Sequence, residues 1–287
     1  MATVLVLQAA LQGLAIGAII ALIALSMTLL FAVCGLVNFA HGDFLALGMY
    51  GALLLAGVGV DPYLAAPAVL VVFVAIGALL FVVLVRPVQR SGLLAGAQLT
   101  LGLVFILENL MLIGFGGTHQ TVRNVLSDRN LSLGGLVLPW QLVVAGLITG
   151  VLAMLLNIMI AHTSFGRHIR AITQNPDAAA LMGVRINRVQ MTAFALALGL
   201  LGLSGPLIVG QFTLTPDMGL DYTLRALIVM VLGGLGNFVG SFIAGLLVGV
   251  GESVATLFFG GAIGAMVPFG LLLAVLLLRP TGLFAQR

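Results

Sequence analysis

The sequence predicts an all-α, polytopic helical membrane protein, and three observations support that prediction. Of the 287 residues, 62 % are hydrophobic, and 38 more are Gly. Charged residues make up only 7 %, against about 25 % in a typical soluble domain. So few charges cannot cover a water-soluble globule of this size, which excludes a soluble enzyme, a nucleic-acid-binding protein and a disordered tail. At roughly 20 residues per crossing, the apolar residues supply at most about ten spans.

Apolar runs divide a single transmembrane domain, residues 1–287, into nine predicted membrane segments. In chain order these are 8–33, 38–58, 62–85, 93–115, 140–162, 189–211, 222–234, 236–257 and 262–279. Because the N-terminus lacks the basic region of a secretory signal, we expect the first run to be a retained span. Segment 222–234 is short for a perpendicular crossing, so we expect a broken or re-entrant helix there. Splitting the first 58 residues would give a tenth span.

Arginines predict the orientation of these segments, because basic residues concentrate in cytoplasmic loops. The expected cytoplasmic arginines are Arg86 and Arg90, then Arg167, Arg170, Arg185 and Arg188, and finally Arg279 and Arg287. The turn at 59–62 and the loop at 116–139 then lie outside. With nine spans, the N-terminus is outside and the C-terminus is cytoplasmic.

Small residues spaced four apart predict close helix packing, because they let backbones approach each other in lipid. The pairs are Gly13/Gly17, Gly92/Gly96, Gly236/Gly240, Gly245/Gly249 and Gly260/Gly264. A faint similarity between 36–48 and 235–245 also suggests an internal repeat, and transporters often place the substrate path between repeats.

The loop at about 163–188 predicts a short helix over Pro176–Met182. Asn175 is a good N-cap, Pro176 suits the first helical position, and Asp177 complements the positive helix end. Gly183 supplies a C-terminal stop.

One face of this short helix carries Ala178, Leu181 and Met182. A two-turn helix is not stable alone in water, so this face needs a cover. Two interpretations are open from the residues alone. The helix lies on the membrane surface, or it docks onto a cytoplasmic protein.

The segment NFAHGDF at 38–44 places Asn38, His41 and Asp43 between two apolar runs. Ionisable groups at membrane depth usually face a cavity or a partner. His41 and Asp43 suit a proton relay, whereas Asn38 or Asp43 equally suits helix capping beside Gly42.

The Gly-rich run VLGGLGNFVG at 231–240 is not a dinucleotide site, because its glycine spacing and its membrane context are wrong. We expect a sharp turn with close backbone packing there. Just upstream, Asp221 and Arg225 are four residues apart and suit an ion pair. Glu108 and Glu252 lie in apolar segments, so each must be protonated, paired or cavity-facing. No spacing matches a metal site or a catalytic motif, so no catalytic residue or metal ligand is expected.

Three stretches together resemble the permeases of branched-chain amino-acid ABC importers. They are NFAHGDFLALGMYGALL at 38–54, RAITQNPDAAALMGVRINRVQMTAFALALGLLGLSG from residue 170, and LRALIVMVLGGLGNFVGSFIAGLLVG at 224–249. They occur in the family's order and cover most of the chain. The resemblance is closer to the first of the two paired permeases than to its longer partner.

This resemblance implies roles for two sets of residues. The cytoplasmic loop helix would be the coupling helix, seated in a groove of the ATPase. The implied coupling residues are Arg170, Asn175, Pro176, Asp177, Ala178, Ala179, Leu181, Met182 and Gly183. The implied translocation-path residues at broken helices are Asn38, Phe39, His41, Gly42, Asp43, Phe44, Gly233, Gly234 and Gly236.

The resemblance therefore implies a permease subunit in the bacterial inner membrane that carries leucine, isoleucine, valine or a related small polar compound. Its partners would be a second permease, two ATP-binding subunits and an external substrate-binding protein, with lipid around it. No cofactor is expected in this chain, since ATP and Mg would bind the ATPase subunits. The alternative is a stand-alone proton-coupled transporter that uses Asp43, His41 and either Glu108 or Glu252.

Overall fold

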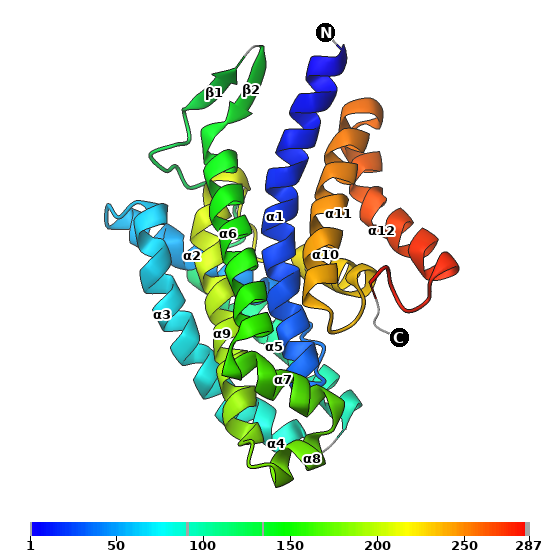
Figure 1. The fold of residues 1–287 in the computed structure, drawn as a ribbon. Coiled ribbons are helices and arrows are strands. Elements are labelled where there is room, and N and C mark those ends of the chain that lie inside the picture. The colour runs from blue at the N-terminus through cyan, green and yellow to red at the C-terminus, as the bar shows by residue number, and fades with distance from the viewer. Residues whose placement is uncertain (1, 90–91, 134, 285–287) are drawn as a thin grey trace.

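The computed structural model describes residues 2–89, 92–133 and 135–284, and it is a bundle of helices (Figure 1). The long helices are α1 (Ala2–Cys34), α3 (Pro62–Leu80), α5 (Leu93–Phe115), α6 (Trp140–His162), α9 (Ile186–Ile208), α11 (Phe238–Phe259) and α12 (Gly261–Leu278). The shorter ones are α2 (His41–Gly57), α4 (Arg86–Val88), α7 (Ser164–Gln174), α8 (Pro176–Leu181) and α10 (Gly219–Gly233). A π-helical turn η1 (Phe81–Val85) continues α3 into α4, and a 3₁₀ turn η3 (Val209–Gln211) follows α9. The all-α prediction is confirmed.

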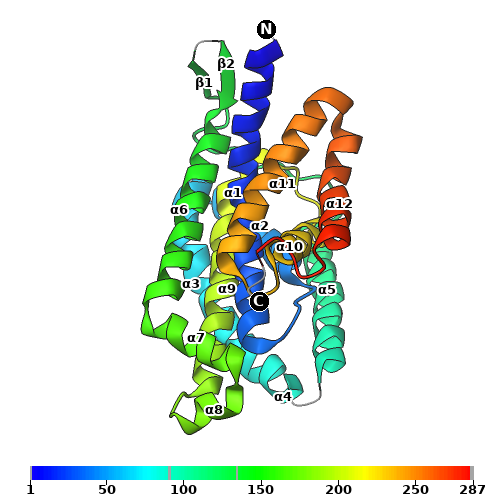
Figure 2. The same ribbon diagram turned by 45° about the vertical axis from the view of Figure 1, so that its right-hand side comes forward.

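Each of the nine predicted membrane segments coincides with a helix. Within the described residues, seven helices are long and apolar enough to cross a membrane. The other two segments form α2, with 17 residues, and α10, with 15. Figure 2 shows α10 nearly end-on while the long helices run down the page, so α10 crosses them at a steep angle. A 15-residue helix is about 22 Å long, shorter than the roughly 30 Å hydrocarbon layer.

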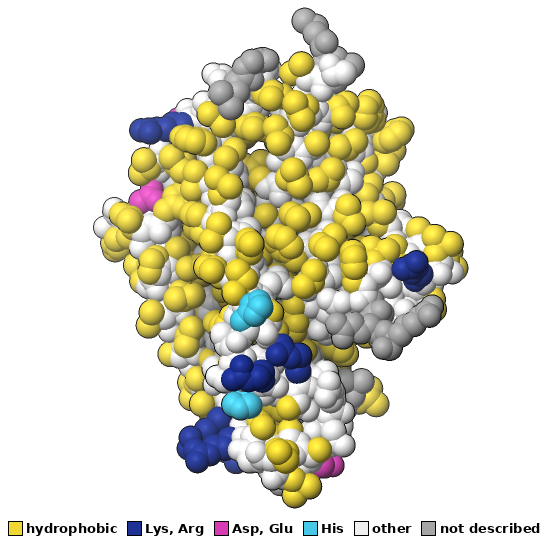
Figure 3. Space-filling model, viewed as in Figure 1, with side chains coloured by type: hydrophobic (Ala, Val, Ile, Leu, Met, Phe, Trp, Pro, Cys, Tyr) yellow, Lys and Arg dark blue, Asp and Glu magenta, His cyan; other side chains and the backbone are white. Residues whose placement is uncertain are grey.

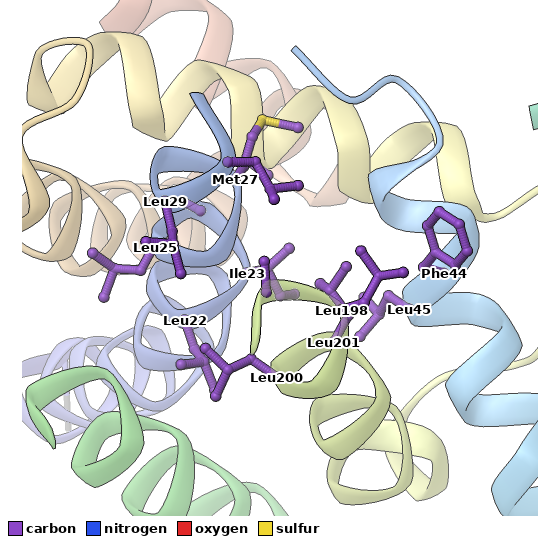
Figure 4. Close-up of a cluster of buried hydrophobic side chains, with 14 of the residues drawn as sticks. Leu22, Ile23, Leu25, Met27, Leu29, Phe44, Leu45, Leu198, Leu200 and Leu201 are labelled. Carbon is purple, nitrogen blue, oxygen red and sulfur yellow. The ribbon is translucent and has the colours of Figure 1, made fainter. Parts of the chain in front are cut away.

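The core of the bundle is built around α1 and α9. In each of these helices 83 % of the most apolar window is buried, against 33 % or less in the other five long helices. Figure 4 shows Leu22 of α1 beside Leu200 of α9. Ile23 of α1 faces Leu198 and Leu201 of α9, with Leu45 of α2 next to them. In lipid such packing depends on close van der Waals contact rather than on removal of apolar surface from water.

Glycines determine how closely α1 approaches α11. A Cβ atom added to Gly13 or Gly17 would clash with the backbone of α11, at Gly249 and Gly245 respectively. A hydrogen bond of 3.0 Å between Thr28 Oγ1 and Ser241 Oγ joins the same two helices further along. The sequence-predicted packing is therefore confirmed for Gly13/Gly17 and Gly245/Gly249, which meet each other.

The other three glycine pairs do not form such a helix interface. Gly92 and Gly260 have open space where a Cβ atom would lie, and Gly236 does too. Their partners Gly96, Gly240 and Gly264 pack instead against a side chain or against a turn nearby in sequence. These pairs lie at helix ends, where only one member of each pair is closely packed: Gly96 against Leu36, Gly240 against Gly233, and Gly264 against Thr256 of α11.

The surface has an apolar belt and a basic end. Figure 3 shows hydrophobic side chains over most of one face, with arginine and histidine side chains gathered toward the end that carries α7 and α8. Lipid-facing side chains such as Ile113 and Leu278 are more than four-fifths exposed. Of the arginines predicted to be cytoplasmic, Arg90 and Arg287 lie outside the described residues.

The end opposite α8 is closed by loops that the sequence predicted to share one side. Asp61 Oδ1 accepts a hydrogen bond from the backbone of Tyr63, and its Oδ2 accepts one from Val125, at 2.9 and 2.8 Å. The turn at 59–62 and the loop at 116–139 therefore do meet. That loop also contains an antiparallel hairpin, β1 (Asn130–Leu133) with β2 (Leu136–Pro139), which the sequence analysis did not predict.

The α1–α11 contact generates the first prediction. Gly17→Val should lower the free energy of unfolding by about 1–3 kcal/mol, because the added side chain overpacks a backbone contact. SDS-titrated unfolding in mixed micelles measures this change. The control is Gly102→Val on α5, where a Cβ atom meets nothing within 4 Å. Equal losses in the two variants would contradict the packing role.

Candidate functional site

The short helix α8 begins and ends as the sequence predicts. Asn175 Oδ1 accepts a hydrogen bond of 3.0 Å from the backbone of Ala178, and Pro176 occupies the first turn. The helix ends at Leu181, one residue before the predicted end, and Gly183 follows with a φ of +85°. That left-handed conformation is the one that glycine adopts without strain.

The apolar face of α8 points away from the protein. Leu181 is 89 % exposed and Met182 is 85 % exposed, and Ala178 and Asp177 are exposed too. Ala179, in contrast, is only 4 % exposed and fastens the helix to the body. Figure 1 shows α8 at the extreme end of the molecule. An exposed apolar face on a capped helix at the tip of a molecule is what a docking surface requires.

The helix α7 connects α8 to the membrane helices. Ile169 and Ile172 are buried in the core. The Arg170 guanidinium donates to the carbonyl of Ile160 at the end of α6, at 2.6 Å. Thr173 Oγ1 donates to the carbonyl of Ala32 at the end of α1, at 3.0 Å. The helix that precedes α8 is therefore hydrogen-bonded to the ends of both α1 and α6.

The helical structure is broken at residues 35–40, between α1 and α2, and we call this segment the first interruption. The start of α10 packs against the end of this segment and the start of α2. A Cβ atom on Gly42 would clash with the carbonyl of Gly219, and one on Gly219 would clash with Asp43. The starts of α2 and α10 are therefore in direct backbone contact. Thr223 Oγ1 accepts a hydrogen bond from the Gly42 N–H at 2.8 Å and lies 3.0 Å from the carbonyl of Phe39.

His41 is held between α1 and α2. Its Nε2 lies 2.9 Å from Ser26 Oγ and 3.0 Å from the carbonyl of Ile23, and the side chain is fully buried. Because a carbonyl only accepts, the second contact needs the proton on Nε2. The ring thus fastens the interruption to the core helix.

Buried polar atoms without a hydrogen-bond partner gather on the same segment. They are Asn38 Nδ2, His41 Nδ1, both carboxylate oxygens of Asp43 and the Tyr50 hydroxyl oxygen. Asn38 Oδ1 does accept from the backbone of Ala40, but Asp43 caps nothing. The capping explanation therefore fails for Asp43. The helix α5, which carries Glu108, packs against α2, which carries Asp43.

The second interruption is the non-helical segment 234–237, between α10 and α11. Gly233 packs directly against the backbone of Gly240 and Ser241, while Gly234 and Gly236 have φ values of +98° and +79°. Asn237 Oδ1 caps α11 by accepting from the backbone of Gly240 at 2.9 Å. The expected sharp turn with close packing is confirmed.

The structure does not bring the two sets of predicted path residues into one site. Phe39, Gly42 and Asp43 contact the start of α10, whereas Gly233–Gly236 follow its end. The length of α10, about 22 Å, separates them. Phe44 lies in the hydrophobic core at 1 % exposure, so its side chain packs rather than faces a path.

Arg225 pairs with Glu252 and not with Asp221, which corrects the expected pair four residues apart. Its Nη1 lies 2.6 and 2.7 Å from the two carboxylate oxygens of Glu252, which comes from α11. Both side chains are partly buried, at 29 % and 16 % exposure. Within a membrane, a charged side chain costs far less free energy when it is paired with one of opposite sign than when it is unpaired.

Sequence reasoning missed Gly219 and Thr223, which hold the first interruption. Their spacing suggests a helix contact, but it can be interpreted only when the partner helix is known. A glycine and a threonine four residues apart lie on one face of a helix and permit close approach and a hydrogen bond. Neither residue identifies α2 as the helix that it contacts.

Comparisons with known proteins show to which protein family the chain belongs. The family model for the permease component of branched-chain amino acid transport systems matches residues 9–276. The high-affinity branched-chain amino acid transport system permease protein BraD of Pseudomonas aeruginosa is 29 % identical, over 98 % of this chain and 96 % of the relative. LivH of Salmonella typhimurium, from a system of the same description, is 28 % identical over the same shares. The ribose import permease protein RbsC of Escherichia coli is 26 % identical over 80 % of this chain and 72 % of the relative. No solved structure matches the chain.

The contact between α2 and α10 generates the second prediction. Thr223→Val should lower the free energy of unfolding by about 1–3 kcal/mol, because it leaves the buried Gly42 N–H without an acceptor. Thr223→Ser keeps the hydroxyl and should recover most of that loss. SDS-titrated unfolding of the three proteins measures it. If the serine variant is no better than the valine variant, the hydrogen bond is not the cause.

The Arg225–Glu252 pair generates the third prediction. Glu252→Gln or Arg225→Met should each destabilise the protein by about 1–3 kcal/mol, less than the ~3–5 kcal/mol for breaking a fully buried pair. The double variant removes both charges and should be more stable than either single one. A double-mutant cycle on thermal unfolding in detergent measures the coupling, and additive losses would exclude the pair.

Proposed function

Because the chain belongs to the branched-chain amino acid transport permease family, we propose that it forms half of the translocation pathway of an ATP-driven importer. The cargo is leucine, isoleucine, valine or a related small polar compound. The names of BraD and LivH support that cargo class, and RbsC supports the range of small polar compounds. The membrane is the bacterial inner membrane, and the chain itself is not an enzyme.

The observation that carries this proposal is the exposed apolar face of α8. Leu181 and Met182 are almost fully exposed at the tip of a helix that is capped at both ends. Such a face suits a groove on an ATPase subunit. Ala179 and the α7 anchors keep α8 rigidly attached, so that movement of the ATPase is passed on to the bundle.

The arginine distribution supports placing α8 in the cytoplasm. Arg167, Arg170, Arg185 and Arg188 flank α8 in sequence, and basic residues favour the cytoplasmic side. The β1–β2 hairpin and the Asp61 turn then face outward, together with the N-terminus. A substrate-binding protein would meet that outer end.

Energy would come from two separate ATP-binding subunits, since the sequence has no phosphate-binding loop of its own. Closure of those subunits would push α8, and α7 would shift the ends of α1 and α6. The chain leaves α1 at the first interruption, where α2 and α10 meet. A shift there would open one side of the path and close the other, as alternating access requires.

A second permease subunit would complete the pathway. The unpartnered polar atoms of Asn38, Asp43 and Tyr50 offer hydrogen-bond donors and acceptors to a polar cargo. Among the described residues, neither the pocket beside Cys34 nor the groove beside α7 has an acidic side chain that could bind the ammonium of an amino acid. Selection of the cargo would therefore rest mainly with the substrate-binding protein.

The alternative, a stand-alone proton-coupled transporter, has in its favour that Asp43 and Glu108 lie on helices that pack together, α2 and α5. Two observations count against it. His41 is held by α1 through Nε2, and Glu252 is occupied by Arg225, so neither extends a proton relay from Asp43.

The coupling role generates the fourth prediction. Leu181→Asp should reduce both ATPase-subunit binding and ATP-driven uptake by at least about tenfold, because a charge enters an apolar interface without a partner. Pull-down and uptake into reconstituted vesicles measure the two effects. The control is Asn187→Asp, which adds the same charge at an exposed position early in α9. Undiminished uptake by Leu181→Asp would exclude α8 as the coupling element.

A further inference from the structure

A groove of about 730 Å³ lies beside α7, and no residue of α2 lines it. It is bordered by the ends of α1 and α6, by α7, by the turn between α10 and α11, and by the segment after α12. Its lining residues with polar side chains are Asn157, Arg170, Thr173, Gln174, Asn237 and Thr281. Apolar side chains that include Ile160, Val231, Leu235, Phe238 and Val239 form most of the rest.

The groove is amphipathic and basic. Arg170 is its charged lining residue, and no aspartate or glutamate is among the residues that line it. Figure 3 shows arginine side chains over the region of α7, whereas the acidic side chains in that view lie at the edges of the molecule. A ligand with an anionic head and an apolar tail fits this division.

The groove lies at the depth where the membrane helices end. Figure 1 shows the α10–α11 turn above α7, and α8 well below both. Ile160 belongs to the last turn of α6, and Val231 to the last turn of α10. Much of the apolar lining therefore comes from the ends of membrane helices, whereas α7 supplies the arginine and two of the other polar residues.

We propose that this groove binds one anionic phospholipid of the inner leaflet, with the phosphate at Arg170 and an acyl chain along Leu235 and Val239. The proposal rests on the cytoplasmic placement of α8 given above. Basic pockets between membrane helices on the cytoplasmic side are known to hold anionic headgroups. Bound there, the lipid contacts α7 and the α10–α11 turn together and thus links the coupling loop to the second interruption.

Individual atoms match such a headgroup. Arg170 donates to the carbonyls of Ile160 and Ala161 through Nη1 and Nη2, which fixes the guanidinium at the groove and leaves further N–H donors for a phosphate. Asn157, one turn earlier on α6, donates through Nδ2 to Ala153, while its buried Oδ1 has no partner.

An ATPase subunit is the competing occupant, and the geometry favours lipid. The exposed apolar face of α8 extends beyond the groove, so a subunit seated on α8 meets that face first. Leu235 in the α10–α11 turn and Val239 in the first turn of α11 are each more than half exposed, beside helices that continue into the apolar belt. Lipid reaches these side chains laterally, without leaving the bilayer.

The test measures lipid retention on the assembled transporter by native mass spectrometry, with phosphatidylglycerol and phosphatidylcholine of identical acyl chains. Phosphatidylglycerol should be retained in preference, and Arg170→Gln should reduce that preference about fivefold, as expected for one arginine at a membrane surface. Arg167→Gln, one turn away and outside the groove lining, should leave it unchanged. Val239→Trp should block retention by filling the groove, whereas Val151→Trp, equally exposed on α6, should not.

Three results would overturn the proposal. The first is equal retention of the two lipids, and the second is equal effects of the Arg170 and Arg167 variants. The third is loss of bound phosphatidylglycerol when ATPase subunits join the permease pair, which would assign the groove to the subunit interface. Glycerol phosphate, which lacks acyl chains, should not compete, and competition by it would reduce the site to an anion site. Lipid retention is measured without any transport assay. A negative result for lipid binding can therefore be told apart from a failure of the proposed import function.

Discussion

The contact between Gly42 and Gly219 is the constraint on which the interior of this protein depends. Two short helices, α2 and α10, start against each other with no room for a side chain between their backbones. The free N–H of Gly42 is satisfied by Thr223, whose hydroxyl also lies against Phe39 and Gly219. Neither helix is long enough to cross the membrane alone, so each needs the other to complete a layer of the bundle.

The helix α1 is held differently along its length. The α1–α11 pair is packed through glycines and joined by the Thr28–Ser241 hydrogen bond. The end of α1 packs through Val33 and accepts hydrogen bonds from Thr173 of α7 and from Gln190 of α9. A displacement of α8 would therefore act on the end of α1 and on the interruption that follows it, while the α1–α11 core keeps its shape.

Local signals in the sequence predict much of this fold. The start of α8 depends on a hydrogen bond between residues three apart, Asn175 and Ala178, and the membrane segments depend on runs of apolar residues. Both can therefore be predicted from the sequence without a structure. Partners distant in sequence are not. The spacing of four suggested Asp221 for Arg225, but the true partner is 27 residues away, on another helix. Likewise, nothing in residues 38–44 reveals that their partners are Gly219 and Thr223, or that Gly233–Gly236 lie at the far end of α10.

If this chain moves cargo only when ATPase subunits drive it through α8, uptake of labelled leucine into vesicles must depend on those subunits. The measurement compares the complete transporter, with its binding protein, with the permease pair alone. We expect ATP-dependent uptake by the complete transporter, and none by the permease pair under a proton gradient. Gradient-driven uptake by the permease pair without ATPase subunits would show that cargo moves without them.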